Sequence, residues 1–412
     1  MDTTSSSTHE FYDLIIVGAG LVGSAMACAL ASSPEGAHLR IAVVEAGGDP
    51  AQFSGTDFDP RVVALTHASR SLLEQVDVWH DIVAQRVCPY TDMDVWDAEG
   101  TGQIHFDCRE VQQLSLGHIV ENSVVTRALL SRIDLLDAID LLRPAKVLNV
   151  QYDEQREVRL VNLEDGRELH APLVIAADGA NSPIRQMAGL HTREWSYGHS
   201  AIVTTVKTEL SHQFTAWQRF LPTGPLAFLP LQSDAGNACS NYSSIVWSIE
   251  DQLVDELMSL DDKAFRKALA DAFEYRLGDI VDVAKRYSFP LRQRHATDYV
   301  DRGLALVGDA AHTIHPLAGQ GVNLGFLDVA VLTEEILRGC ERQLPLSEHS
   351  ILKRYQRRRK SHNLSMMAIM EAFKRLFGTR DLPVRWLRNE GMRQLNGLAP
   401  LKNAIVRQAM GL

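Results

Sequence analysis

A short apolar run near the start of the chain is its first regular pattern. Residues 12–17 (YDLIIV) predict a buried strand, because the run is almost uninterrupted and rich in β-branched residues. The small residues of 21–32 predict a helix, and a second apolar run at 39–44 predicts another buried strand. Strand, helix and strand in this order form a βαβ unit, which favours a parallel sheet covered by helices.

Later segments repeat this alternation between buried strands and half-buried ones. Residues 148–169 alternate apolar and polar positions around a turn signal at 164–166, which predicts an antiparallel meander. Buried-strand character returns at 173–177 and at 304–307. Residues 200–249 carry longer alternating strands, and we interpret them as a separate sheet-rich domain.

These patterns divide the chain into three regions of an α/β protein. We expect a discontinuous, Rossmann-like nucleotide-binding domain, a sheet-rich substrate domain inserted into it, and a C-terminal helical region. The predicted nucleotide-binding domain comprises residues 10–83, 112–188 and 288–345, the substrate domain residues 84–111 and 189–287, and the helical region residues 346–412.

A glycine fingerprint, GxGxxG, lies between the first strand and the first helix. Its first glycine permits a tight turn, its second lets the backbone approach a pyrophosphate, and its third lets helix and strand pack closely. The helix N-terminus then faces the phosphates with its partial positive charge. The expected contacts in this segment are Gly18, Ala19, Gly20, Val22 and Gly23. Glu45 ends the next strand, where a carboxylate can accept hydrogen bonds from ribose hydroxyls.

A second set of nucleotide-type motifs stands nearly 300 residues further along. Gly308 and Asp309 follow a buried strand, so the carboxylate can bind ribityl hydroxyls, cap a helix, or do both. Asp178 with Gly179 ends a third buried strand, and such strand ends line the ligand crevice of open α/β sheets. Two widely separated motifs indicate a long cofactor held at both ends, which favours FAD over NAD.

The stretch that follows offers backbone N–H groups at another expected helix start. Its residues are Gly319, Gln320, Gly321, Val322 and Asn323. Directed at the pyrimidine edge of a flavin, this helix dipole would favour the anionic reduced ring by about 0.3–2 kcal/mol.

Composition limits the class of protein. The chain has 412 residues, 45% of them hydrophobic, which is ordinary for a globular protein of more than one domain. Five scattered cysteines without a CxxC pair argue against a disulfide framework or a zinc site and fit a reducing cytoplasm. The N-terminus lacks a basic signal-peptide region, and no run of 18 apolar residues predicts a membrane span. We therefore expect a cytoplasmic protein with no metal and no nucleic-acid partner.

Charge is unevenly distributed along the chain. Residues 351–412 contain 14 Lys/Arg against 3 Asp/Glu, although the whole chain has a net charge of −11. Apolar residues lie at helical spacing beside the basic segment 353–360: Met366, Met367, Ile369, Met370, Phe373, Leu376 and Phe377. Two interpretations stay open, a peripheral contact of 351–412 with the inner membrane or a protein partner, and helix packing onto the nucleotide-binding domain.

The motifs resemble those of a known family. GxGxxG, Asp178-Gly179 and Gly308-Asp309, in this order, resemble the class A flavoprotein aromatic monooxygenases of the para-hydroxybenzoate hydroxylase type. Residues 308–325 (GDAAHTIHPLAGQGVNLG) closely resemble the ubiquinone-biosynthesis hydroxylases. Four further stretches resemble one branch of these, the bacterial 2-octaprenylphenol hydroxylases: residues 93–97, 116–124, 226–231 and 407–412.

The resemblance implies further site residues. Arg61 matches an arginine segment beside the flavin, Asn122 a polar position near the cofactor, and Arg127 an arginine that contacts the pyrophosphate. His315 and Pro316 match the loop beside the isoalloxazine ring. The substrate pocket is expected between the flavin face and the inserted sheet. We expect its wall to contain Phe228, Leu229 and Pro230, unless these residues only form sheet core.

The implied reaction is hydroxylation of the aromatic ring of a polyprenylated phenol in ubiquinone biosynthesis, through a flavin C4a-hydroperoxide formed with O2. NAD(P)H or a reductase would donate electrons, and no catalytic base is identified among His118, His199 and His315. Alternatives are a hydroxylase of a soluble phenol, a flavoprotein reductase of prenyl chains, and a non-catalytic assembly subunit of a ubiquinone-biosynthesis complex. An NAD-dependent dehydrogenase is disfavoured by Gly308-Asp309.

Overall fold

A six-stranded, mostly parallel sheet forms the centre of the computed structural model, which describes residues 9–233, 241–313, 321–379 and 381–411. Its strand order is β20 (Val300–Asp301), β21 (Leu304–Leu306), β13 (Leu173–Ala176), β2 (Leu14–Val17), β3 (Ile41–Val44) and β9 (Ile139–Leu142). β2, β3, β13 and β21 are buried along their whole length. Continuous apolar runs are typical of parallel strands covered on both faces, so these four predicted strands are confirmed.

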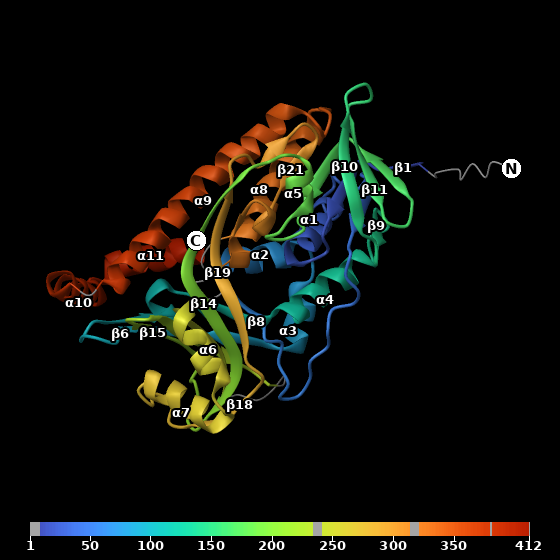
Figure 1. Ribbon diagram of the computed structural model, residues 1–412. Coiled ribbons are helices and arrows are strands. Elements are labelled where there is room, and N and C mark those ends of the chain that lie inside the picture. The colour runs from blue at the N-terminus through green and yellow to red at the C-terminus, as the bar shows by residue number, and fades with distance from the viewer. Residues whose placement is uncertain (1–8, 234–240, 314–320, 380, 412) are drawn as a thin grey trace.

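Helices and a small second sheet cover this parallel sheet. α1 (Leu21–Ala31), α4 (Asn122–Ile133) and α8 (Gly321–Glu341) share one hydrophobic core with it. The predicted meander is confirmed: β10 (Val147–Asp153), β11 (Val158–Leu163) and β12 (Glu168–Ala171) pair antiparallel, and β12 also pairs with β1 (His9–Phe11). In Figure 1 the meander lies on the side of the molecule opposite the C-terminal helices.

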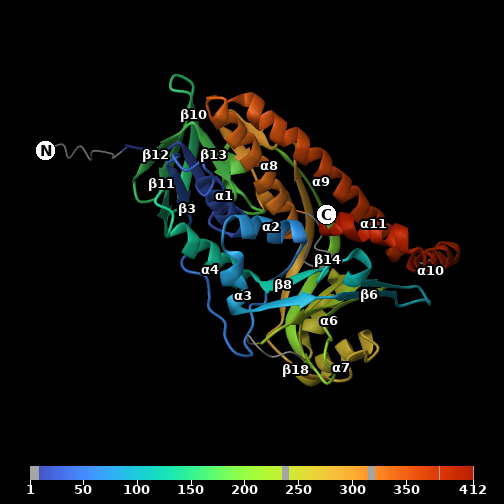
Figure 2. The same ribbon diagram turned by 180° about the vertical axis from the view of Figure 1, so that it is seen from behind.

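A nine-stranded sheet lies below the parallel sheet in Figures 1 and 2. Its strands, in spatial order, are β22 (His312–Thr313), β19 (Tyr287–Ala296), β14 (Thr192–Thr208), β17 (Tyr242–Glu250), β16 (Gly224–Leu231), β15 (Thr215–Leu221), β6 (Asp92–Asp97) and β7 (Gln103–Asp107), with β18 (Ile280–Val283) beside β14. Residues of α6 (Asp251–Ser259) and α7 (Asp262–Ala272) pack with one face of this sheet. The other face therefore remains available to the nucleotide-binding part.

A three-stranded sheet and short helices join the two large sheets. β4 (Val62–Leu65), β8 (Gly117–Glu121) and β5 (Val87–Tyr90) form this sheet. α2 (His67–Gln75), α3 (Trp79–Gln85), α5 (Pro183–Met187) and the short helices η1 (Cys108–Val111) and η2 (Gly308–Ala310) complete the connections.

Three helices, which together we call the C-terminal arm, occupy most of residues 349–410. α9 (His349–Gly378) packs along α8, whereas α10 (Leu382–Gly397) contacts β7 and α11 (Ala399–Met410) contacts η1. Figure 2 shows this arm running from the nucleotide-binding part to the outer strands of the nine-stranded sheet. The arm therefore connects both parts of the molecule.

Candidate active site

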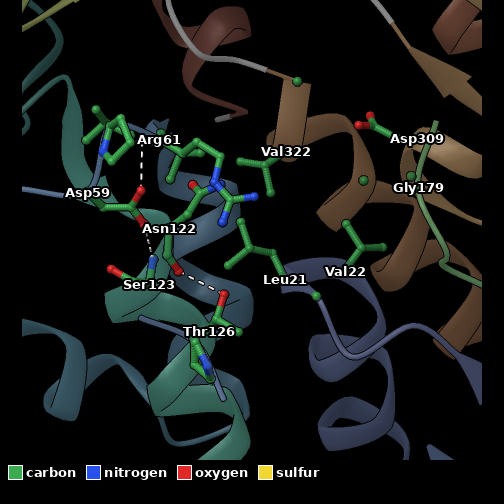
Figure 3. Close-up of a pocket in the computed structure, with 18 of the residues that line it drawn as sticks. Leu21, Val22, Asp59, Arg61, Asn122, Ser123, Thr126, Gly179, Asp309 and Val322 are labelled. Atoms are coloured by element: carbon green, nitrogen blue, oxygen red, sulfur yellow. Dashed lines mark hydrogen bonds between the residues drawn. The ribbon is translucent and has the colours of Figure 1, made fainter. Parts of the chain in front are cut away.

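A cavity of about 940 Å³ lies between the parallel sheet and the nine-stranded sheet. The carboxyl ends of parallel strands, where ligands of open α/β sheets bind, supply Glu45, Ala177 and Val307 to its lining. Figure 3 shows Arg61 and residues of α4 facing residues of α1 and α8 across this space. Segments that are far apart in the sequence thus surround one elongated site.

The three fingerprint glycines occupy different environments. A Cβ atom on Gly23 would lie 1.9 Å from the Gly18 carbonyl oxygen, and one on Gly18 would lie 2.4 Å from the Ala177 carbonyl oxygen. Gly18 also has a φ of +105°, which favours glycine. A Cβ on Gly20 would meet nothing within 4 Å, and Gly20 lines the cavity. Two glycines therefore allow close packing, while the third leaves room above the N-terminus of α1.

Glu45 holds the loop before α1 at one end of the cavity. The Ala19 N–H donates to Glu45 Oε2 at 2.7 Å, and the Gly47 N–H donates to Glu45 Oε1 at 2.6 Å. Arg143, which the sequence reading missed, also lines this end and pairs with Asp49. These charged groups are suited to the sugar and phosphates of a nucleotide.

Asp309 marks the other end of the cavity. Its side chain opens into the cavity, and burial by the surrounding protein raises the pKa of its carboxyl group. Gly321 and Val322, in the first turn of α8, line the same region. The N-terminus of a second helix therefore faces the cavity near a carboxylate.

A buried network fixes the middle of the site. The Arg61 and Ser123 N–H groups donate to the two carboxylate oxygens of Asp59, at 2.9 and 3.0 Å. Glu121 Oε1 accepts from the Asp59 N–H at 2.7 Å and from Arg86 Nη2 at 3.0 Å. These bonds position the segment from which the Arg61 side chain reaches the cavity.

An unpartnered polar atom in the cavity indicates a ligand. Asn122 lines the cavity, and its Oδ1 is buried without a hydrogen-bond partner among the described residues. Such an atom costs free energy unless a ligand donates to it. Together with the open space at Gly20 and the charged groups at both ends, it fits a long dinucleotide such as FAD.

Five expected cofactor contacts lie outside the cavity lining, namely the packing glycines Gly18 and Gly23 and the side chains of Arg127, Asn323 and Asp178. Arg127 instead donates to the Ala51 carbonyl and to Gln85 Oε1, each at 2.9 Å. Asn323 is buried and bonds Ser69, Thr66 and Ala64, so its amide ties α8 to β4 and α2. Asp178 accepts from the Ile184 N–H at 3.1 Å, while its neighbour Gly179 reaches the cavity. Partners within the protein occupy the side chains of Arg127 and Asn323, whereas Asp178 Oδ1 is buried without a hydrogen-bond partner among the described residues.

The predicted wall residues Phe228, Leu229 and Pro230 lie outside the lining of the cavity. Phe228 stacks on Phe273, with ring centroids 3.7 Å apart, on the face of the sheet that packs against α7. Leu229 lies opposite Ser244 on the other face of the sheet, in a cluster with Phe58 against which the cavity residues Val62 and Val246 pack. The wall instead comes from β14, β17 and β19, through Ala201, Val203, Ser244, Val246, Tyr287, Phe289, Pro290, Leu291 and Arg292.

Several predicted residues cannot be placed at the site. His315, Pro316, Gly319 and Gln320 lie outside the described residues. His118 and His199 are described, and neither lines the cavity. Burial lowers the pKa of His118 to about 4, so this imidazole is neutral at pH 7.

One group of metal-type ligands occurs in the part of the chain that the structure describes, and it lies outside the cavity. It consists of Asp92, His105 and Asp107, with ligand atoms within 4.8 Å of one another. His105 pairs with Asp92 at 3.3 Å, and Asp107 pairs with Arg109 at 2.6 Å. These ion pairs account for the cluster without a metal.

A buried ion pair links the Gly308-Asp309 loop to the C-terminal arm. Asp328 Oδ2 accepts from the Gly308 N–H at 2.9 Å and bonds His312 Nε2 at 2.6 Å. Asp328 Oδ1 accepts from Arg359 Nε at 2.6 Å, and Arg359 also donates to Asn363 Oδ1 at 2.8 Å. α8 and α9 thereby fix the loop that carries Asp309.

The basic segment 353–360 is largely neutralised by α8. Arg358 pairs with Glu334 and Glu335, at 2.7 and 2.8 Å, and Arg354 pairs with Glu335 at 2.7 Å. In the apolar stripe beside it, Met366, Met367 and Met370 pack with residues of α8, and Phe377 stacks on Phe220. These contacts favour the packing interpretation for α9. The side chain of Phe373 lies outside the description.

Comparison with solved structures identifies the fold. The p-nitrophenol 4-monooxygenase of Pseudomonas putida DLL-E4 has a TM-score of 0.76 at 19% identity, covering 97% of this chain and 98% of that one. A probable FAD-dependent monooxygenase of Pseudomonas aeruginosa, pqsL, has a TM-score of 0.73 at 21% identity, with coverages of 93% and 100%. At such identities these similarities establish the fold alone, the fold of FAD-dependent monooxygenases.

Sequence comparison identifies the family. A family model described as "FAD binding domain" matches residues 12–369. The 3-demethoxyubiquinol 3-hydroxylase of Escherichia coli (strain K12) is 36% identical over 98% of this chain and 100% of that protein. The ubiquinone hydroxylase UbiL of Rhodospirillum rubrum is 37% identical, over 99% of this chain and 91% of that protein. The mitochondrial ubiquinone biosynthesis monooxygenase COQ6 of Xenopus tropicalis is 36% identical, over 98% of this chain and 94% of that protein. The chain belongs to the FAD-binding-domain family, among the ubiquinone-biosynthesis monooxygenases, and its cofactor is FAD.

Substitution of two fingerprint glycines should separate packing from cofactor binding. Gly20→Ala adds a methyl group in open space, so we expect an unchanged melting temperature without FAD. The Kd for FAD should rise at least about tenfold, because the methyl group keeps the pyrophosphate from the backbone. Gly23→Ala forces a clash with the Gly18 carbonyl and should lower the melting temperature itself. Equal FAD affinity in Gly20→Ala and the wild-type protein would contradict this assignment.

The ion pair beneath the Asp309 loop should dominate the stability of the arm. Arg359→Gln leaves Asp328 buried without its cationic partner, and we expect a loss of about 3–5 kcal/mol in the free energy of unfolding. The matched control is Arg357→Gln, because Arg357 is exposed two residues away and should change stability by less than about 0.5 kcal/mol. Urea unfolding measures both, and equal values for the two variants would refute the role of the pair.

Proposed function

We propose that this protein hydroxylates the aromatic ring of a polyprenylated phenol in ubiquinone biosynthesis. O2 would supply the oxygen atom, and NAD(P)H or a reductase the electrons. The observation that carries the proposal is the single cavity, which runs from the FAD motifs to an apolar face of the nine-stranded sheet. Relatives named as ubiquinone-biosynthesis hydroxylases over nearly the full length support this substrate class.

The residues of the chain have three tasks in this reaction. Bound FAD supplies the redox chemistry that activates O2. The N-termini of α1 and α8, with Glu45 and Asp309, hold the cofactor at its two ends. Asn122 and Arg61 line the middle, where Asn122 Oδ1 can accept a hydrogen bond from the cofactor.

The face of the nine-stranded sheet positions the substrate ring. Val203 of β14 lies opposite Tyr287 of β19 and Val246 of β17, so these three side chains form one row across the sheet. Phe289 lies opposite Ala201 in the next row along the same face. This surface favours an aromatic ring with an apolar substituent and excludes water, which protects a reactive oxidant from wasteful breakdown.

A membrane-dissolved substrate requires contact with a bilayer, and we propose that α10 and α11 make it. No helix among the described residues is long and apolar enough to cross a membrane. α10 instead exposes Leu382, Trp386 and Leu387. Leu398, at the start of α11, and Leu401 and Ile405 within it are exposed as well. The opposite face of α11 packs against η1 through Val406 and Met410. An interfacial helix has this division into a packed face and an exposed apolar face.

Product analysis tests the proposed reaction. FAD-loaded protein, a reductant and a prenylated phenol should give a product 16 mass units heavier in air, and none without O2. A soluble phenol such as phenol itself should react at least about tenfold more slowly, because it buries less apolar surface. Reduction of the prenyl chain without O2 would indicate a reductase, and absence of the flavin absorption near 450 nm would indicate an assembly subunit.

Vesicle binding tests the proposed membrane contact. The triple variant Leu398→Ser, Leu401→Ser and Ile405→Ser should bind vesicles of phosphatidylcholine and phosphatidylglycerol about tenfold more weakly while retaining FAD. The control substitutes three exposed leucines elsewhere, Leu114→Ser, Leu135→Ser and Leu210→Ser, and should bind like the wild-type protein. Cosedimentation measures both, and an equal effect of the two triple variants would count against this surface.

A further inference from the structure

A buried serine lines the substrate side of the cavity without a partner. Ser244 of β17 is 1% exposed, and its Oγ has no hydrogen-bond partner among the described residues. Ser244 nevertheless belongs to the lining of the cavity. A buried hydroxyl that is left unpaired costs free energy, and at the cavity wall a ligand can recover this cost by bonding it.

The surroundings of Ser244 give its hydroxyl a particular task. Val246 lies on the same face of β17, because side chains two residues apart in a strand point to the same side. Val203 lies opposite Val246 on the neighbouring strand, and both valines line the cavity. Ser244 is therefore a polar group beside apolar residues on the wall that faces the substrate space.

We propose that the Ser244 hydroxyl hydrogen-bonds the ring oxygen of the phenolic substrate and thereby sets which ring edge faces the cofactor. A serine hydroxyl both donates and accepts, so it can pair with a phenol O–H or with a ring oxygen that carries no proton. The neighbouring valines contact the apolar part of the ring. The identity of this ligand rests on the proposed function, whereas the preference for a ring oxygen is measurable as binding alone.

The adjacent serine provides a matched control within the same strand. Ser243 is 0% exposed, and its Oγ is also buried without a partner among the described residues. Because strand side chains alternate, Ser243 shares its face with Ile245, which packs in the core that contains α7 residues. Ser243 is not part of the cavity lining. The two serines therefore differ in the face they occupy while sharing burial and lack of a partner.

Binding of two probes to the FAD-loaded protein tests the proposal without turnover. The probes are geranylphenol and geranylbenzene, which differ only in the ring oxygen. The wild-type protein should bind the phenol about fivefold more tightly than the benzene, the effect of one net hydrogen bond. In Ser244→Ala this ratio should fall to about one, through weaker binding of the phenol alone. In Ser243→Ala the wild-type ratio should persist.

Folding and turnover readings complete the test. Ser244→Ala removes an unpartnered hydroxyl, so its melting temperature and flavin absorption should equal those of the wild-type protein. The proposal is overturned if wild-type protein binds both probes equally, if neither binds, or if Ser244→Ala keeps the wild-type ratio. Failure of the proposed function would give a different result. The wild-type protein would then still bind the two probes with different affinities but form no hydroxylated product.

Discussion

The close packing of α1 against the parallel sheet is the constraint on which the rest of the site depends. Gly18, Gly23 and Ala177 approach so closely that a side chain on either glycine would overlap a backbone carbonyl. This contact directs the N-terminus of α1 at the cavity. The side chain of Val22 then lies against Gly308 and Gly325, where an added Cβ would be 3.1 and 2.6 Å from Val22 Cγ2. Val22 of α1 therefore packs directly against the glycines of the second nucleotide motif.

The second half of the site depends on groups that hold the nine-stranded sheet and the arm in place. β14 and β19 are long and pair with each other, and β19 also pairs with β22, which contains His312. The sheet that faces the substrate is therefore continuous with the strand that carries His312. His312, Asp328 and Arg359 then connect this edge to α8 and α9. Arg359 of α9 thus helps to fix, through Asp328, the loop that carries Gly308 and Asp309. The arm combines this internal role with the exposed apolar face of α10 and α11.

Much of the fold could be predicted because its signals are local. Buried parallel strands are continuous apolar runs, and the fingerprint follows one of them directly, so β2, α1 and β3 follow from the pattern. Positions at strand ends, such as Glu45 and Asp309, could be placed beside a nucleotide for the same reason. Arg143 also directly follows a parallel strand, but this strand, β9, is not among those that the sequence predicts.

Several side chains have partners that only the folded structure determines. Alternation assigns Phe228 and Leu229 to opposite faces, but only the folded sheet determines that Phe228 faces α7 and that Leu229 lies opposite Ser244 on the other face. Asn323 lies beside glycines that open a helix, yet its amide finds partners in β4 and α2. Arg359 belongs to a basic run that suggests a surface, although Asp328, 31 residues earlier, pairs with it in the interior. Tertiary partners decide all three cases.

A crystal structure of the FAD complex tests the central claim most directly. We expect the adenosine end beside Glu45, the isoalloxazine ring between Asp309, the first turn of α8 and the row formed by Val203 and Val246, and Asn122 Oδ1 accepting a hydrogen bond from the cofactor. A cofactor bound outside this cavity would contradict the account. So would a ring separated from the nine-stranded sheet by intervening protein.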